Sequence, residues 1–300
     1  MKKQTTAKVF KVLKQSETKL LKKSNVVGVG IGEKITDGKR TGRVCLKVYV
    51  EKKIAKEKLS GSDLVPALIS NVETDVMEVG KIRPLASNRQ RSRPALGGAS
   101  IGHFKITAGT LGCLVKDKKT GKTLILSNNH VLANSNLGKK GDAILQPGAA
   151  DGGKNPKDKI AELDRWVEIG FGKKGNTADA ALALPFNEKD VSPEISSIGI
   201  PKGTAKGKVG LIVQKTGRTT EHTLGEIKDI SATVRIDYDG QTALFKNQIM
   251  TSAMSQGGDS GSLILDQKRR AVGLLFAGSE LVTICNPIQE VFKSLKCELR

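Results

Sequence analysis

The sequence predicts a mainly β protein preceded by a small α+β domain, and three observations support this assignment. Short apolar runs recur between turn residues through the last two thirds of the chain. The 33 glycines against nine prolines favour tight turns over long helices. A polar, arginine-rich segment, 83–100, separates this region from a basic N-terminal part. We therefore expect a domain over 1–84, a linker over 85–98 and a second domain over 99–300.

The N-terminal part begins with a predicted helix, followed by a β-hairpin. The helix spans 5–23, with Thr5 or Thr6 as its cap and lysines around most of its surface. Its apolar side is formed by Val9, Leu13 and Leu20. Two alternating strands around a glycine-bearing turn predict a hairpin over 25–53, and a third strand is expected over 72–80.

The positive charge is concentrated in the N-terminal third. The whole chain has a formal net charge of +20, and residues 1–98 carry 22 Lys and Arg against nine Asp and Glu. Such an excess attracts polyanions, so an acidic or polyanionic partner is expected for residues 1–84. Solubility alone explains the same charge equally well, and both interpretations stay open.

Several function classes find no support in the sequence. No apolar stretch reaches the roughly 18 residues of a membrane span, and the basic start lacks the apolar core of a signal peptide. We therefore expect a cytoplasmic protein, whose oligomeric state the sequence does not predict. The three histidines and four cysteines lack metal-ligand spacing, so we expect no metal and no cofactor. Buried, reduced thiols are expected, although a Cys285–Cys297 bridge remains possible.

The C-terminal two thirds contain eleven apolar runs. They span 110–115, 123–127, 142–146, 160–170, 180–184, 209–216, 224–236, 243–254, 261–266, 271–278 and 281–286. So many short runs indicate an all-β barrel or sandwich of more than one sheet. A helix is expected over 287–296, with Pro287 at its start. One face of this helix is apolar: Ile288, Val291, Phe292 and Leu295.

Three polar residues form a candidate catalytic group. Ser260 lies in the glycine-rich turn GGDSG, and a serine hydroxyl becomes a nucleophile only beside a base that a third group orients. Of the histidines, His103 lies next to the linker and His222 lies in a polar turn. His130 directly follows an apolar strand that would fix its ring, and Asp179 opens another apolar run. Taken singly, each residue fits turn or capping chemistry as well as catalysis.

Together these residues match a known pattern. Residues 99–297 resemble the chymotrypsin-like serine endopeptidases, especially the bacterial branch typified by α-lytic protease. The resemblance lies in LSNNHV around His130, ADAALAL around Asp179, GGDSGSL around Ser260 and the hairpin KTGRTTEHTLGEI upstream of the serine. It implies two six-stranded antiparallel β-barrels with a C-terminal helix. The asparagines before His130 depart from the small residues that are usual there.

The resemblance implies a role for each residue of the group. Ser260 would attack the scissile carbonyl of a protein or peptide substrate, His130 would act as base and then acid, and Asp179 would orient the imidazole. The backbone amides of Gly258 and Ser260 would form the oxyanion hole, which explains the glycines at 257 and 258.

The resemblance also places the specificity pocket. Its floor lies six residues before the serine, at Met254, where an acid would select Arg or Lys. A methionine predicts a preference for uncharged, small to medium or hydrophobic P1 residues. The expected pocket wall consists of Phe276, Ala277 and Gly278.

The first 98 residues lie outside this resemblance. The whole arrangement is similar to a bacterial group of trypsin-like proteases that is distantly similar to the plant narrow-leaf type. The N-terminal domain would be a pro-region released by cutting near 88–98, or a permanent targeting module. Two other functions stay open: a catalytically silent protease fold used as a binding module, and a nucleic-acid-binding protein acting through its basic domain.

Overall fold

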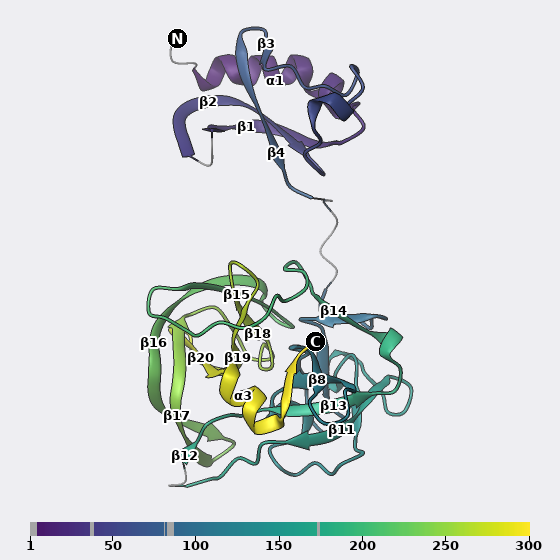
Figure 1. The fold of residues 1–300 in the computed structure, drawn as a ribbon, viewed down its shortest axis with the longest axis vertical. Coiled ribbons are helices and arrows are strands. Elements are labelled where there is room, and N and C mark those ends of the chain that lie inside the picture. The colour runs from purple at the N-terminus through teal and green to yellow at the C-terminus, as the bar shows by residue number, and fades with distance from the viewer. Residues whose placement is uncertain (1–4, 37–38, 81, 83–86, 173–174) are drawn as a thin grey trace. The chain divides into compact units, whose positions relative to one another are not determined.

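The structure is a computed structural model and describes residues 5–36, 39–80, 82, 87–172 and 175–300. Its internal contacts divide the chain into two compact units, Met1–Leu85 and Ala86–Arg300 (Figure 1). Within the described ranges, no helix has the length and apolar character needed to cross a membrane.

The first unit consists of one helix and a four-stranded sheet. Its elements are α1 (Thr6–Leu21), β1 (Val26–Thr36), β2 (Lys39–Val50), the short 3-10 helix η1 (Lys56–Lys58), β3 (Leu68–Ile69) and β4 (Val72–Glu78). The strand order is β1-β2-β4-β3, in which β1 and β2 are antiparallel and β2 and β4 are parallel. The predicted helix, hairpin and third strand are confirmed, while turn residues 37–38 lie outside the described residues.

The helix packs on one face of this sheet. Its buried residues, together with those of the strands they contact, are Val9, Val12, Leu20, Leu46, Val48 and Val72. Val12 is more deeply buried than Leu13, which was expected on the apolar face. Thr5 occupies the N-cap position, but its side chain makes no capping hydrogen bond. The apolar face rather than the cap therefore holds this helix in place.

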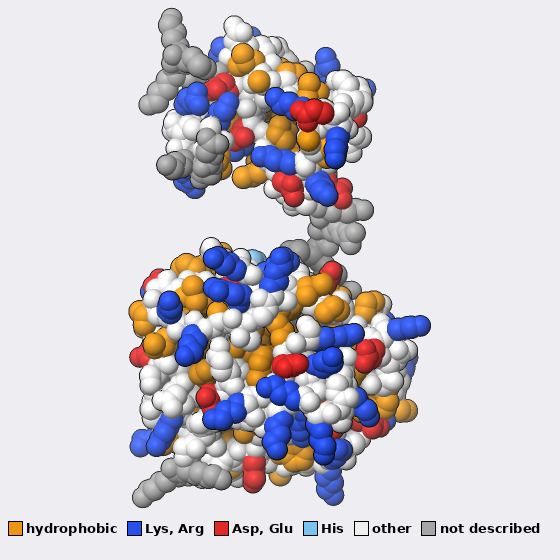
Figure 2. All heavy atoms as spheres, in the orientation of Figure 1, with side chains coloured by type: hydrophobic (Ala, Val, Ile, Leu, Met, Phe, Trp, Pro, Cys, Tyr) orange, Lys and Arg blue, Asp and Glu red, His pale blue; other side chains and the backbone are white. Residues whose placement is uncertain are grey.

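Some of the positive charge of the first unit is used internally. Lys34 pairs with Glu73 at 2.8 Å, and Lys47 pairs with Asp75 at 2.5 Å. Figure 2 shows other Lys and Arg side chains spread over the visible surface, between apolar and acidic ones. The acidic or polyanionic partner expected for residues 1–84 stays a prediction.

The second unit contains two large sheets. The first sheet has the strand order β21-β8-β9-β13-β11-β10-β6-β7. Its strands are β6 (Ser100–His103), β7 (Gly109–Thr110), β8 (Cys113–Asp117), β9 (Thr123–Ser127), β10 (Ala143–Leu145), β11 (Lys159–Trp166), β13 (Ala181–Pro185) and β21 (Cys297–Leu299). Between β9 and β10 lies the short helix α2 (Asn129–Leu132), and η2 (Ala149–Asp151) follows β10.

The second sheet closes into a barrel because β17 pairs with both β16 and β20. Its strands are β12 (Gly175–Asn176), β15 (Ile212–Gly217), β16 (Glu221–Tyr238), β17 (Gln241–Ser252), β18 (Leu263–Asp266), β19 (Ala271–Gly278) and β20 (Val282–Pro287). The six strands from β15 to β20 form the closed part, and β12 adds to β17 in parallel. The paired strands β16 and β17 are the longest of this sheet (Figure 1).

The terminal helix agrees with the sequence prediction. It forms α3 (Ile288–Leu295), with Pro287 at its N-cap and all four expected residues buried. These residues join a core that includes residues of both sheets, such as Leu126 and Leu274. The four cysteines are buried and unpaired, as the buried-thiol interpretation expected, and burial raises the pKa of Cys297 to about 12.

The linker prediction is wrong for residues 87–98, which pack against the second unit. Asn88 Nδ2 donates to the carbonyl of Gly217 at 2.9 Å. The strand β5 (Ala95–Gly97) pairs in parallel with β14 (Val191–Ile195), which follows the 3-10 helix η3 (Glu188–Asp190). This polar segment is held by hydrogen bonds and one short strand, so it lacks the apolar periodicity that marks regular structure in a sequence. The rest of the predicted linker, residues 85–86, lies outside the described residues.

Candidate active site

The structure brings His130 and Asp179 into direct contact. His130 Nδ1 and Asp179 Oδ2 are 2.6 Å apart, and the Asp179 side chain is fully buried while that of His130 is 23% exposed. His130 lies in α2, three residues after the end of β9, rather than directly at the strand end. Asp179 lies two residues before the start of β13, which pairs with β9. Adjacent strands of one sheet therefore place the acid beside the base.

Two asparagines before His130 hold this arrangement. The backbone amide of Asn129 donates to Asp179 Oδ1 at 2.7 Å, and Asn128 Nδ2 donates to the Asp179 carbonyl at the same distance. The Asn129 side chain also forms hydrogen bonds with Asn136, which lines a cavity described below. The residues that depart from the bacterial pattern thus fix the position of the carboxylate.

Ser260 is not hydrogen-bonded to this pair. Its hydroxyl donates to the carbonyl of Phe276 at 3.4 Å, and no hydrogen bond joins it to His130 among the described residues. A Cβ added to Gly109 would lie 2.4 Å from the Val131 side chain and 3.1 Å from the Ser260 carbonyl oxygen. Ser260 and Val131, the residue after His130, therefore both pack against Gly109.

The turn before Ser260 presents two free amides. Neither the N–H of Gly258 nor that of Ser260 donates a hydrogen bond within the described chain. Gly258 has φ of +94°, and a Cβ there would lie 2.5 Å from an Arg218 nitrogen and 2.6 Å from Thr219 Oγ1. Gly257 is different, since a Cβ there meets no atom within 4 Å. Only Gly258 is required by sterics, whereas the sequence suggested a need for both glycines.

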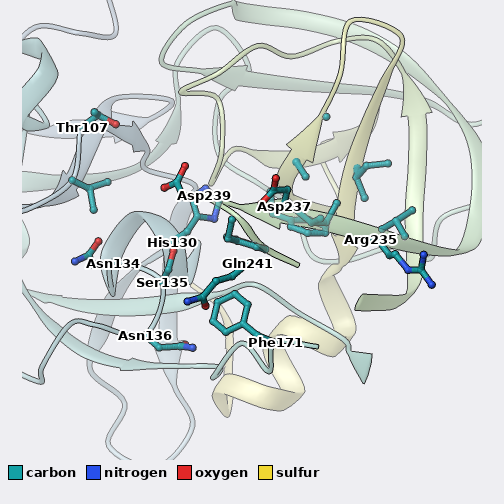
Figure 3. Close-up of a pocket in the computed structure, with 18 of the residues that line it drawn as sticks. Thr107, His130, Asn134, Ser135, Asn136, Phe171, Arg235, Asp237, Asp239 and Gln241 are labelled. Carbon is teal, nitrogen blue, oxygen red and sulfur yellow. The ribbon is translucent and has the colours of Figure 1, made fainter. Parts of the chain in front are cut away.

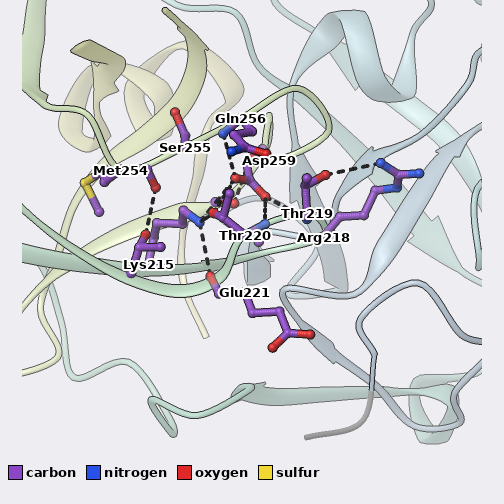
Figure 4. Close-up of polar contacts among 12 residues, drawn as sticks. Lys215, Arg218, Thr219, Thr220, Glu221, Met254, Ser255, Gln256 and Asp259 are labelled. Carbon is purple, nitrogen blue, oxygen red and sulfur yellow. Dashed lines mark hydrogen bonds and ion pairs between the residues drawn. The ribbon is translucent and has the colours of Figure 1, made fainter. Parts of the chain in front are cut away.

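A buried ion pair between Lys215 and Asp259 holds the same turn in place (Figure 4). Lys215 Nζ lies 3.3 Å from Asp259 Oδ2, and both side chains are fully buried. The ammonium also donates to the carbonyl of Glu221, and Asp259 Oδ1 accepts from the amide of Thr219 at 2.8 Å. Asp259 lies between Gly258 and Ser260 in the chain, so this pair fixes the direction of both free amides.

The charge of Asp259 persists despite its burial. Burial works to raise its pKa, but the Lys215 ammonium and hydrogen bonds from Thr220, Gln256 and Thr219 outweigh it and hold the pKa below its ordinary value. Burial also lowers the pKa of Lys215, against the attraction of Asp259. A paired charge of this kind is costly to leave without its partner.

Two cavities lie beside the candidate residues. The larger, of about 1270 Å³, is lined by His130, the loop after α2 and the tip of the β16–β17 hairpin, so both sheets contribute to it (Figure 3). The smaller, of about 830 Å³, is lined by Ser260 and Met254. Residues Ala277–Gly278 of β19 line both.

The predicted specificity residues fall into these two cavities. Met254, Ala277 and Gly278 line the cavity that contains Ser260, and Met254 is buried with its sulfur against Gly225. Phe276 differs from the others because it lines only the larger cavity, and its ring packs against that of Phe245 at a centroid distance of 4.7 Å. The other two histidines lie in contacts of their own, His103 with Asp142 and His222 with Gln214.

No cluster of three or more potential metal ligands occurs among the described residues. The site nevertheless contains groups that the sequence did not point to. Tyr238 Oη donates to Asp179 Oδ2 at 2.8 Å, and Lys215 forms the buried pair under the glycine turn. A lysine in an otherwise apolar strand, VGLIVQKT, is the one sequence signal that could have identified the second of these groups.

Comparisons with known proteins agree with the fold of the second unit. It is similar to Thermobifida fusca Protease A (19% identity, TM-score 0.50) and to Nocardiopsis Protease (19%, 0.51), each over 68% of this chain and 97% and 98% of theirs. A glutamic acid specific serine protease is similar over all of its length, with 20% identity, 68% of this chain covered and a TM-score of 0.50.

Sequence comparison reaches further along the chain. The chain is 24% identical over 312 residues to Protein NARROW LEAF 1 of Oryza sativa subsp. japonica, covering 87% of this chain and 52% of the relative. It therefore spans about half the length of the curated relative that it matches. No protein-family profile matches the chain. With its two sheets, terminal helix and structural relatives, the second unit has the chymotrypsin-like fold.

The two glycines of the turn should respond differently to an added methyl group. Gly258→Ala should lower the free energy of unfolding by about 1–3 kcal/mol, because it forces a side chain into a left-handed conformation and against Arg218. Gly257→Ala should change it by less than about 0.5 kcal/mol, since the space is open. Urea denaturation of both variants measures the difference, and equal losses would contradict the steric account.

The buried pair of Lys215 and Asp259 should make the free energy of unfolding depend on pH in the acidic range. The folded-state pKa of Asp259 lies below its unfolded value near 4, so the stabilisation is complete above about pH 4 and is lost as the pH falls through the folded value. Urea denaturation between about pH 5 and pH 2 should show a shallower decline for Lys215→Met combined with Asp259→Asn than for the wild type. Parallel declines would show that the pair contributes nothing to acid sensitivity.

Proposed function

We propose that the second unit is a serine endopeptidase that hydrolyses peptide bonds through an acyl-enzyme. The contact between the buried Asp179 carboxylate and His130 Nδ1 carries this proposal. It fixes the tautomer, because Nδ1 donates to the acid and leaves Nε2 as the acceptor. His130 lines the cavity between the two sheets, and its Nε2 makes no hydrogen bond within the described residues.

The first half of the reaction forms an ester with the enzyme. Ser260 Oγ attacks the scissile carbonyl carbon while its proton passes to His130 Nε2. The carbonyl oxygen becomes an oxyanion that accepts hydrogen bonds from the free amides of Gly258 and Ser260. The tetrahedral intermediate then breaks its C–N bond, and the leaving amine takes the proton from His130.

The second half returns the enzyme to its starting state. A water molecule gives a proton to His130 Nε2 and attacks the ester carbon, forming a second oxyanion in the same place. Collapse releases the new carboxyl group, and Ser260 Oγ takes the proton back. Asp179 stays ionised throughout and stabilises the imidazolium that forms twice in each cycle.

One observation favours the alternative of a silent binding module. The Ser260 hydroxyl donates to the Phe276 carbonyl instead of to His130, so it must turn about its Cα–Cβ bond before it can react. Such rotation is ordinary in sites without bound substrate, where catalytic hydrogen bonds are often absent. The alternative predicts a protein that folds normally but never modifies its serine.

Covalent labelling distinguishes the two functions. A labelled fluorophosphonate should modify the wild-type protein at Ser260, and casein should be cleaved, because the hydroxyl is activated by His130. Ser260→Ala should lose both reactions while keeping the unfolding midpoint of the wild type. A folded wild type that takes no label and cleaves no casein would support the binding module.

The preference at P1 follows from the smaller cavity. Met254 contributes a soft apolar surface, and Ala277 and Gly278 leave room beside it. Among the described residues lining this cavity, the one charged side chain is that of Glu280, which is exposed. No histidine lines it either, although the glutamic acid specific relative uses a histidine triad in substrate binding. We infer that uncharged, small to medium or hydrophobic P1 residues fit best.

A peptide library tests this inference. Cleavage should be most frequent after residues such as Ala, Val, Leu or Met, with charged P1 residues cleaved at least about tenfold more slowly, because burying an unpaired charge is costly. Mass spectrometry of the cleaved library measures the preference. Predominance of Arg, Lys or Glu at P1 would overturn it.

A further inference from the structure

The Asp179 carboxylate receives a hydrogen bond from an unexpected part of the fold. Its side chain is fully buried, and each oxygen has two donors. The amides of Asn129 and His130 bond Oδ1 at 2.7 and 3.3 Å, and the His130 ring bonds Oδ2. The fourth donor is the hydroxyl of Tyr238, 2.8 Å from Oδ2. Three donors thus come from the neighbourhood of the base, and one comes from the other sheet.

Tyr238 reaches this position at the tip of a hairpin. It is the last residue of β16 and pairs with Gln241, the first residue of β17. Both strands belong to the closed second sheet, whereas His130 follows β9 and Asp179 precedes β13, two strands of the first sheet. Asp237 and Asp239, the neighbours of Tyr238 in the chain, line the same cavity as His130 (Figure 3). The hairpin therefore extends from one sheet to the candidate catalytic pair of the other.

The tyrosine ring also contacts the imidazole. Its centroid lies 6.0 Å from that of His130 with an interplanar angle of 66°, and 6.0 Å from that of Phe171 at 79°. Edge-on contacts of this kind are favourable between aromatic rings. A phenylalanine would keep this packing, so the hydroxyl has one distinct task, which is to donate to Asp179. Burial and the adjacent carboxylate raise the pKa of Tyr238, so it stays a neutral donor.

We propose that Tyr238 is a positioning residue, whose hydroxyl fixes Asp179 Oδ2 against His130 Nδ1 and thereby completes the catalytic group from the second barrel. This inference rests on the proposed peptidase function. Without the hydroxyl, Oδ2 keeps the histidine as its only donor, and the carboxylate can rotate about its Cβ–Cγ bond. The imidazole then spends less time with Nε2 directed at the serine, which slows both proton transfers.

The test compares Tyr238→Phe with wild type and with the matched control Tyr49→Phe, which alters the chain's other tyrosine, in the first unit. For Tyr238→Phe, kcat should fall about tenfold while KM changes less than about twofold, since only orientation in the transition state is lost. The other charged groups at the cavity, Lys105, Arg235, Asp237 and Asp239, are the same in all three proteins.

A second measurement does not require activity. The proton between His130 Nδ1 and Asp179 should give a low-field ¹H NMR signal, which should move in Tyr238→Phe and stay in place in Tyr49→Phe. Unchanged kinetics together with an unchanged proton signal would overturn the positioning role while leaving the peptidase intact. A wild type without activity would instead refute the proposed function, and the proton signal alone would then decide whether Tyr238 holds the pair.

Discussion

The geometry of the second unit depends on the fully buried carboxylate of Asp179. An ionised group in this position is tolerated only when hydrogen bonds replace its hydration, and the Asp179 oxygens receive four. Its backbone is held as well, because the Asp179 amide donates to Asn286 Oδ1, and Asn286 donates in turn to Gln248. Residues of both sheets thus converge on one acid, and the position of His130 follows from it.

The glycine turn around Ser260 also contains a buried carboxylate, that of Asp259, but here a cation compensates its charge. Here the fully buried Lys215 provides the compensating cation, and Asp259 links it to the two free amides of the turn. The proposed chemistry moves a proton onto an imidazole and negative charge onto a carbonyl oxygen. Each of these two changes is met by a group already fixed in place, so little reorganisation is needed at the moment of reaction.

Local patterns predicted most of the fold, while long-range polar contacts escaped prediction. Apolar periodicity predicted the strands and the terminal helix. Motifs in a known order pointed to Ser260, His130 and Asp179. Tyr238 and its acceptor are 59 residues apart, and Lys215 and Asp259 are 44 apart, so neither pair shares a pattern that one sequence could reveal. The packed segment 87–98 was missed because side-chain hydrogen bonds, which have no period, hold it in place.

The hairpin contact also bears on how the chain is made. Because the Asp179 amide donates to a residue as distant as Asn286, the proposed catalytic group is complete only after nearly all of the second unit has been synthesised and folded. Contacts of such sequence separation form late in folding. If the second unit has the proposed peptidase activity, a nascent or partly unfolded chain would lack it, and neighbouring unfolded copies would be protected from cleavage.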